Sequence, residues 1–350
     1  MYKNSSILYA PNVHNGGGLT LLKSLLTEWR DDLELLAILD ERCKNDIQQL
    51  KLANVTVLYW VKTNLISRIL SEIKLAKIAH SNKHVFCFHN IPPILCQSSH
   101  ITIYFQNRLI IEESLKKIVS LKTFFVINLE RWIIKNFYRP HMRYITQTDS
   151  IRIKLQEWLL KNANVRAEPK SIPFRPPFKD IRQNECTQKK WDFLYISSSE
   201  PHKNIYVLLE AWRLLGNQGI KPSLAITIDK KNRKLIETLN IHYSDLNIIN
   251  LGTLSHEEVM DAYQTTQAFI HPSLIESLPT TLIEAKHFNL PILAPELDYV
   301  RDVCAPVETF NPNSSLSISR AVKRFLKINE LIIKPLAGDE FWDTILSNSR

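Results

Sequence analysis

Two glutamates, Glu276 and Glu284, stand out because of the segment in which they occur. The apolar run 268–270 predicts a strand, a short polar loop follows it, and Pro279 has a position typical of a helix start. Glu276 would then lie in the loop and Glu284 inside the helix, beside the free backbone N–H groups of a helix N-terminus. The apolar run 291–294 predicts the next strand, so the segment has the strand–loop–helix–strand pattern of a parallel α/β sheet.

An anion site with two carboxylates beside it does not suit a bare phosphate. It suits a ligand with phosphate at one end and hydroxyl groups at the other, because a carboxylate accepts hydrogen bonds from a vicinal diol. A nucleotide sugar is such a ligand. The alternative is that the two glutamates only stabilise the start of the helix, where acidic side chains interact favourably with the helix dipole.

The sequence of residues 271–294 reads His-Pro-Ser-Leu-Ile-Glu-Ser-Leu-Pro-Thr-Thr-Leu-Ile-Glu-Ala-Lys-His-Phe-Asn-Leu-Pro-Ile-Leu-Ala. It closely resembles the signature of the retaining glycosyltransferases of family 4, which have the GT-B fold. In that family, two glutamates separated by seven residues contact the sugar donor. The resemblance implies that Glu276 lies at the transferred sugar as a catalytic residue and that Glu284 binds the ribose hydroxyls. It also implies that Ser273 and Ser277 belong to the donor-binding set.

The resemblance further implies an α/β chain of two Rossmann-like parallel-sheet domains that face each other across a cleft. A length of 350 residues suits two such domains, and 45% hydrophobic with 23% charged residues is ordinary for a globular protein. We expect an N-terminal, acceptor-side domain at residues 1–170 and a proline-containing linker at 171–190. A nucleotide-sugar-binding domain is expected at 191–330, and a C-terminal helix at 331–350 would pack back on the first domain.

Three of the seven glycines of the chain are consecutive, Gly16, Gly17 and Gly18. They follow a predicted strand at 7–10 and precede a helical pattern that begins at Leu19. This clustering predicts a loop that a phosphate approaches closely, and a simple tight turn is the alternative. In the resembled family this first loop packs against the diphosphate of the donor, which makes the three glycines candidate donor-binding residues.

Further strands are predicted in the first half at 35–39, 55–60, 85–88, 101–105 and 144–146. His89 directly follows one of them, and the resemblance implies that this histidine faces the transferred sugar as a second catalytic residue. Gln106, Asn107 and Arg108 end another strand in the same way and could reach the donor or the acceptor.

The second half opens with a predicted strand at 191–197, a loop at 198–204 and an amphipathic helix. In the resembled family a lysine of this loop binds the donor diphosphate, which assigns that role to Lys203. An arginine usually precedes that lysine, but Ser198 stands at the corresponding position of this chain. His202 is a candidate to replace the missing charge.

The formal net charge is +9, and much of it lies between Lys116 and Arg143, where aromatic and aliphatic residues alternate with basic ones. Such a segment is typical of a helix that rests on an anionic membrane surface. A helix that packs on the core and exposes a basic face to solvent explains the pattern equally well. Nucleic acid is not expected as a partner, because no nucleic-acid-binding motif accompanies the charge.

The remaining features narrow the function further. The five cysteines are scattered without metal-ligand spacing, and no Asp-x-Asp sequence occurs, so we expect no cofactor, no metal site and no obligatory metal ion. The N-terminus does not resemble a signal peptide and no apolar run reaches 18 residues, which predicts a cytoplasmic protein, peripheral at most on the cytoplasmic membrane face.

We therefore expect a retaining glycosyltransferase that uses a nucleoside-diphosphate sugar. Its acceptor would be a glycan or an undecaprenyl-linked oligosaccharide in bacterial surface polysaccharide (O-antigen or capsule) synthesis. A nucleotide-sugar epimerase or a non-catalytic sugar-nucleotide-binding protein of the same fold are the alternatives.

Overall fold

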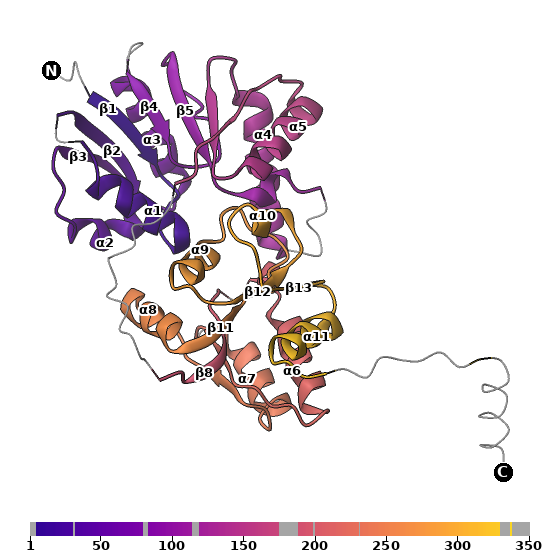
Figure 1. The fold of residues 1–350 in the computed structure, drawn as a ribbon. Coiled ribbons are helices and arrows are strands. Elements are labelled where there is room, and N and C mark those ends of the chain that lie inside the picture. Colours follow the sequence, from indigo (N-terminus) through magenta and orange to yellow (C-terminus); the bar gives the residue numbers. More distant parts are fainter. Residues whose placement is uncertain are drawn as a thin grey trace.

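The computed structural model describes residues 5–30, 32–79, 83–113, 119–174, 188–198, 200–230, 232–329 and 337. Within these residues the chain forms two parallel β-sheets, each covered by helices, with the N-terminal sheet in the upper half of Figure 1 and the C-terminal sheet in the lower half. The fold is therefore α/β with two Rossmann-like halves, as the sequence predicts. The expected C-terminal helix at 331–350 falls outside the described residues, apart from Ala337.

The first sheet has the strand order β3-β2-β1-β4-β5-β6-β7. Its strands are β1 (Ser5–Ala10), β2 (Glu34–Asp40), β3 (Val55–Val61), β4 (His84–Cys87), β5 (His100–Phe105), β6 (Arg143–Thr146) and β7 (Lys170–Ser171). The helices of this half are α1 (Gly16–Thr27), α2 (Lys44–Gln48), α3 (Leu65–Ile78), α4 (Leu121–Phe137) and α5 (Asp149–Ala163), with 3₁₀ turns η1 (Glu41–Cys43) and η2 (Arg108–Ile111).

The second sheet has the order β10-β9-β8-β11-β12-β13. Its strands are β8 (Trp191–Tyr195), β9 (Leu224–Ile226), β10 (Ile248–Asn250), β11 (Thr266–Ile270), β12 (Ile292–Pro295) and β13 (Glu308–Phe310). The helices are α6 (Ile205–Gly216), α7 (Arg233–His242), α8 (His256–Gln264), α9 (Thr280–His287), α10 (Asp298–Arg301) and α11 (Ser315–Phe325), with the 3₁₀ turn η3 (Pro201–Lys203).

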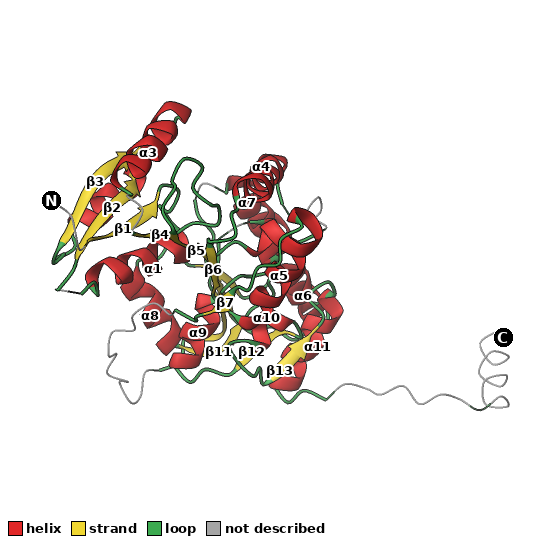
Figure 2. Ribbon diagram, turned by 90° about the horizontal axis from the view of Figure 1, so that it is seen from above, coloured by secondary structure: helices red, strands yellow, loops and turns green. Residues whose placement is uncertain are grey.

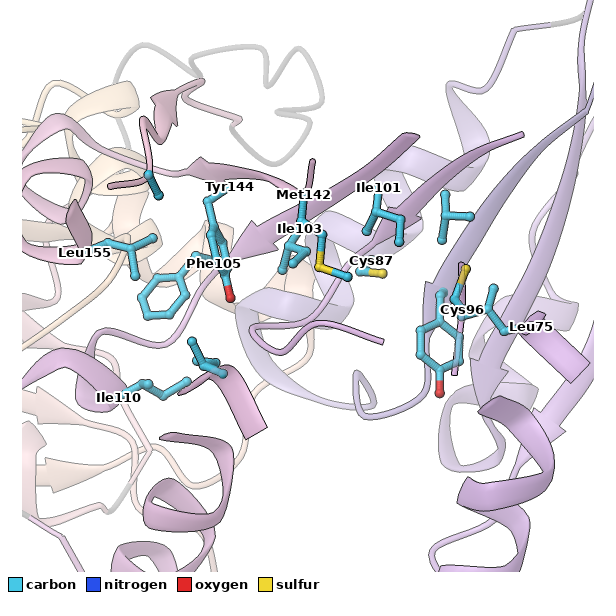
Figure 3. Close-up of a cluster of buried hydrophobic side chains, with 14 of the residues drawn as sticks. Leu75, Cys87, Cys96, Ile101, Ile103, Phe105, Ile110, Met142, Tyr144 and Leu155 are labelled. Carbon is cyan, nitrogen blue, oxygen red and sulfur yellow. The ribbon is translucent and has the colours of Figure 1, made fainter. Parts of the chain in front are cut away.

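Each half buries its own apolar core. In the N-terminal half, one face of the sheet packs against Leu75 of α3 and Ile127 of α4, and the opposite face packs against Leu22 of α1. Figure 3 shows part of the first of these cores around Ile103 and Tyr144. Because α3 and α4 contribute to the same core, they cover the same face of the sheet, and Figure 2 shows them on one side of the molecule.

Several local features accompany these elements. Ser255 and Glu258 form a capping box at the start of α8. The predicted face of α6 is buried, with Trp212 at its centre. Four of the five cysteines, Cys43, Cys87, Cys96 and Cys304, are buried and free, and Cys186 lies outside the described residues. Among the helices that the structure describes, none is both long and apolar enough to cross a membrane.

Candidate active site between the two sheets

Four loops meet where the order of strands reverses in each sheet. In the first sheet this point lies between β1 and β4, and in the second between β8 and β11. Ligands of open parallel sheets bind at the carboxyl ends of such strands. The three glycines follow β1, His89 follows β4, Lys203 follows β8, and Ser273, Glu276 and Ser277 follow β11, so eight of the nine predicted site residues come from the segments after these strands.

The side chains of Lys203 and Glu276 are in direct contact. Lys203 Nζ donates a hydrogen bond to Glu276 Oε1 over 2.6 Å, and both side chains are largely buried. The two loops are fixed to each other by a backbone hydrogen bond of 2.8 Å from the Leu274 N–H to the His202 carbonyl. The hydroxyl of Tyr195, at the end of β8, donates to the carbonyl oxygen of Lys203 and holds the lysine in place.

The ion pair controls the charge of Glu276. Burial alone would raise the pKa of this carboxyl, but the adjacent Lys203 outweighs burial and holds the pKa below its usual range. On the other side, His271 Nε2 lies 3.9 Å from Glu276 Oε1. Burial lowers the pKa of His271 to about 4, so its ring is neutral at pH 7, and neither ring nitrogen has a hydrogen-bond partner among the described residues. Glu276 is therefore an ionised carboxylate with a single cationic partner in the described part of the chain.

The three glycines form the first turn of α1, which corrects the prediction that they form a loop before a helix starting at Leu19. Gly16 has a φ of +60°, a conformation that glycine adopts without strain. Gly17 faces α9 of the other half, since a Cβ at Gly17 would lie 3.6 Å from Thr280 Cγ2. The glycines thus allow the N-terminus of α1, with its free N–H groups, to approach the second domain closely.

A large cleft with a volume of about 1200 Å³ separates the two halves near these loops. Gly16 and the start of α4 line it on the N-terminal side. On the C-terminal side the lining comes from the loops after β8, β9 and β10, and includes Ser198, Glu200, His202, Asp229 and Thr253. A smaller cavity of about 170 Å³ contains Gly17, Gly18, Gln106, Glu276 and Ser277. Glu276 thus lines the small cavity, and its partner Lys203 directly follows His202 of the large cleft without lining either space.

The position of Ser198 carries no positive charge. Its hydroxyl donates to the carboxylate of Glu200, so this edge of the cleft is acidic. His202 also lines the cleft, but burial and then the neighbouring Lys203 lower its pKa, which makes it neutral at pH 7. In the free protein His202 therefore carries no charge in place of the missing arginine, although its ring can still form hydrogen bonds, and its role toward a ligand stays a prediction.

Ser277 links the two domains. Its Oγ accepts a hydrogen bond of 2.7 Å from the backbone N–H of Arg108, and it lines the small cavity beside Glu276. The buried Arg108 guanidinium binds both carboxylate oxygens of Asp298 in α10 and also Glu112. Lys154 of α5 contacts the same Asp298 over 2.8 Å. This four-residue cluster, the interdomain cluster, holds the second domain against the first beside the site.

Four predicted site residues do not line the cavities described above, namely Lys203, whose contacts are given above, and Ser273, Glu284 and His89. Ser273 is fully buried, and its Oγ lies 3.4 Å from the hydroxyl of Tyr195, so it supports the loop from beneath. Glu284 points to α8, where its carboxylate accepts a hydrogen bond of 3.0 Å from Tyr263. His89 is buried in the first domain, where its Nδ1–H donates to the Tyr9 carbonyl over 3.2 Å. Burial lowers the pKa of His89 to about 4, which leaves a neutral ring with Nε2 as its acceptor.

The structure adds one residue that we did not single out from the sequence. Gln147 follows β6 and lines the small cavity together with Glu276. A polar residue that directly follows a predicted strand, Ile145–Thr146 in this case, is a signal that could have identified it. Among the described residues, no group of three or more His, Cys, Asp or Glu side chains is arranged to hold a metal ion. Metal-independent chemistry remains a prediction.

Comparison with known proteins supports the sequence resemblance. Residues 178–333 match the family model of glycosyl transferases group 1. No curated protein sequence matches the chain significantly. The matched segment includes Lys203, Glu276 and Glu284.

Three solved structures illustrate the fold. The chain superposes with a TM-score of 0.62 and 13% identity on HepE of Anabaena in complex with UDP and glucose, covering 92% of this chain and 90% of that one. Sucrose-phosphate synthase from Thermosynechococcus elongatus gives a TM-score of 0.65 at 14% identity, with 93% and 90% covered. The lipopolysaccharide outer core galactosyltransferase WaaB gives 0.58 at 13% identity, with 92% and 90% covered. The fold is accordingly GT-B.

Proposed function

We propose that this protein, a glycosyltransferase with a group 1 domain at residues 178–333, binds a nucleoside-diphosphate sugar in the large cleft. It would transfer the sugar with retention of anomeric configuration to a glycan or lipid-linked oligosaccharide. The observation that carries the donor assignment is the contact between Glu276, which lines the small cavity, and Lys203, the neighbour of His202 in the large cleft. One side chain suits the diphosphate and the other suits the hydroxyls of the sugar.

The chemistry requires stabilisation of the departing diphosphate. When the bond between the anomeric carbon and the phosphate oxygen breaks, the leaving group takes the electron pair and gains negative charge. The ammonium of Lys203 and the N–H groups at the start of α1, including Gly17 and Gly18, would stabilise that charge. The acceptor hydroxyl forms the new bond to the anomeric carbon and releases its proton to the departing diphosphate.

Glu276 would orient the sugar rather than attack it. In the free protein Glu276 is ionised and bound to Lys203. Once Lys203 turns to the diphosphate, the carboxylate oxygens of Glu276 can accept hydrogen bonds from sugar hydroxyls. Nε2 of His89 would accept a hydrogen bond from a further sugar hydroxyl, because its Nδ1–H already donates to the Tyr9 carbonyl. Ser277 and Glu284 are the remaining proposed donor-binding residues. The Glu284 side chain would have to break its hydrogen bond with Tyr263 and rotate to reach the ribose.

We assign the acceptor to a membrane surface because of two exposed apolar stripes. On α4, Phe125 and Trp132 are 70% and 54% exposed, with Leu121 and Leu129 on the same face. Helix α3 also exposes an apolar face, consisting of Leu65, Ile66, Ile69, Leu70 and Ile73. Since both helices cover one side of the N-terminal sheet (Figure 2), the stripes face outward from the same part of the molecule.

The charges around these stripes suit anionic lipid. Exposed lysines occur near both ends of each helix, namely Lys62, Lys77, Lys122 and Lys135. Long lysine side chains reach the headgroups while apolar residues enter the interface. Two basic residues of the segment have structural roles instead, because Arg131 donates to the Ile110 carbonyl and Arg139 to the Cys96 carbonyl. Phe124 is also half-buried against the core, so it does not belong to the exposed stripe. An undecaprenyl-linked oligosaccharide of surface polysaccharide synthesis is the acceptor that this placement favours.

Donor turnover provides the test of the enzymatic proposal. The protein is incubated with UDP-, GDP-, ADP- and dTDP-sugars without acceptor, and release of the nucleoside diphosphate is followed together with the anomer of the freed sugar by proton NMR. The proposal predicts slow release from one donor class, with the sugar first appearing in its original anomeric configuration. Release of the inverted anomer would contradict retention. An epimerase would instead convert the sugar, and a non-catalytic protein would bind a nucleotide without turnover.

Liposome co-sedimentation tests the membrane assignment. Binding to vesicles of phosphatidylcholine with phosphatidylglycerol should fall at least about fivefold in the double variant Phe125→Ser and Trp132→Ser. Ile241→Ser removes an equally exposed apolar side chain from the other domain and should leave binding unchanged. Equal binding of the double variant and the parent protein would refute the assignment.

A further inference from the structure

A third cavity lies between the two domains and is separate from the large cleft. We name it the interdomain pocket; its volume is about 520 Å³. The N-terminal half contributes Gln147, Thr148 and Phe174, and the C-terminal half contributes Leu278, Ile283 and Asp302. A volume of this order accommodates one or two sugar rings.

The interdomain pocket adjoins the candidate site. Gln147 and Leu278 line both this pocket and the small cavity that contains Glu276. The large cleft shares no described lining residue with the interdomain pocket. A ligand in the pocket would therefore approach Glu276 from a different direction than a nucleotide in the large cleft.

Gln147 carries a polar atom without a partner at this boundary. Its side chain is only 4% exposed, and its Oε1 makes no hydrogen bond to any described residue. The Gln147 amide instead interacts with the buried hydroxyl of Tyr104. Buried amide oxygens are nearly always hydrogen-bonded in folded proteins, so an unpaired one beside a cavity points to a missing donor such as a ligand hydroxyl.

The lining of the interdomain pocket suits an uncharged carbohydrate. Phe174 provides an aromatic ring, and Thr148 and Ser171 provide hydroxyl groups. Two carboxylates, Asp149 and Asp302, can accept hydrogen bonds from sugar hydroxyls.

The same lining is unfavourable for a phosphate. None of the described lining residues is a lysine or an arginine. Arg152 pairs with the lining residue Asp149, and Lys286 donates to the carbonyl of the lining residue Val303. Asp302 accepts a hydrogen bond from the neutral Ser150 hydroxyl. Among the described lining residues, a phosphate would therefore meet the carboxylate of Asp302 without a cationic partner.

We propose that the interdomain pocket binds the terminal sugar of the acceptor, with Gln147 Oε1 accepting a hydroxyl of that sugar, and that it selects uncharged sugars over phosphorylated ones. This inference rests on the proposed function, because an acceptor is only needed if the protein is a transferase. The inference adds to that function where the acceptor binds and that its terminal sugar is uncharged. The hydroxyl that reacts would pass between Gln147 and Leu278 toward Glu276.

Saturation-transfer NMR tests the proposal without knowledge of the natural acceptor. The probes are the methyl glycosides of glucose, galactose, mannose and N-acetylglucosamine, compared with glucose 6-phosphate, galactose 6-phosphate and mannose 6-phosphate. Each is measured with and without the nucleoside diphosphate that stabilises the protein most. At least one methyl glycoside should bind, and the phosphorylated sugars should bind about tenfold more weakly or not at all.

Variants assign the binding to the pocket. Phe174→Ala and Gln147→Leu should each weaken glycoside binding about fivefold or more. Asp302→Lys should reduce the preference for uncharged sugars. Asp32→Asn, in an exposed pair with Arg30, is the matched control and should change nothing. Nucleotide-induced thermal stabilisation of each variant shows that it is folded.

The outcomes separate the two proposals. If no methyl glycoside binds, if binding is unaffected by both Phe174→Ala and Gln147→Leu, or if the phosphorylated sugars bind as well as the uncharged ones, the acceptor assignment is overturned. If no nucleoside diphosphate stabilises the protein, the proposed function itself fails, whatever the glycosides do.

Discussion

Lys203 and Glu276, 73 residues apart in sequence, form a hydrogen-bonded ion pair of 2.6 Å at the meeting point of the two domains. Each side chain neutralises the other in the free protein. Donor binding must therefore rearrange this pair, with Lys203 turning to the diphosphate and Glu276 to the sugar. The predictions below follow from this exchange and from the groups around it.

Replacing Lys203 by Met should abolish productive donor binding. The substitution removes the cation nearest the proposed diphosphate position and leaves Glu276 buried without its partner. We expect donor turnover to fall by about 10² to 10³-fold. Lys221→Met removes an exposed lysine elsewhere in the same domain and should be neutral. Unchanged turnover in the Lys203 variant would show that the diphosphate binds elsewhere.

The acidic edge at Ser198 should limit affinity for the donor. Glu200→Gln removes a negative charge from the cleft, and Ser198→Arg adds a positive one. At a solvated site each change is worth about 1 kcal/mol, so nucleoside-diphosphate affinity measured by calorimetry should rise about fivefold in either variant. The gain should shrink in high salt because the interaction is screened. A loss of affinity in Glu200→Gln would mean that this carboxylate contacts the ligand directly.

Glu284 should make the protein less stable as pH rises toward neutrality. Burial raises its pKa to about 7, above the usual value of a glutamate in an unfolded chain. The folded state therefore holds a proton that the unfolded state loses, and stability falls between about pH 4.5 and pH 7 by up to about 3 kcal/mol. Glu284→Gln should be more stable than the parent at pH 8 and similar at pH 4.5 in urea unfolding. Glu257→Gln, on the exposed side of α8, is the control, and identical pH profiles for all three proteins would contradict this explanation.

Asp298→Asn should loosen the contact between the domains. Asp298 binds Arg108 and Lys154, and although burial opposes it, these two side chains lower its pKa to about 2. The stabilisation is present above about pH 4 and is lost as pH falls through 4 toward 2. Because Asp298 is partly exposed, we expect a loss of only about 1 kcal/mol. Small-angle scattering at pH 7 should show a larger radius of gyration for the variant. Glu296→Gln breaks an exposed pair with Arg301 and should not alter the radius.

The longer elements were predictable from sequence because their patterns are local. Strands such as β1 and β11 are apolar runs, and α6 shows one apolar face, so their places needed no knowledge of distant residues. The strands β7, β9, β10 and β13 contain only two or three residues, too few for a pattern to be recognised. These short strands form because a neighbouring strand of the sheet offers backbone groups with which they can form hydrogen bonds.

The site was predictable where a single motif carries it, as at Glu276, and unpredictable where two distant segments meet. The bond between Arg108 and Asp298 joins residues 190 positions apart, and nothing in either segment indicates its partner. The glycines were recognised as special, but the sequence did not indicate that they form the first turn of α1 or that Gly17 lies close to Thr280 of the other half. Gln147 becomes a candidate site residue only because β6 ends at the cavity that Glu276 also lines.

The most direct test of the account is a thermal-shift measurement of the protein with UDP, GDP, ADP, dTDP and CMP, repeated with Lys203→Met. The account predicts that one nucleoside diphosphate raises the melting temperature selectively, by several degrees at saturating concentration, and that this stabilisation disappears in the variant. Absence of stabilisation by every nucleotide, or equal stabilisation of the parent and the variant, would contradict a donor site built around Lys203 and Glu276.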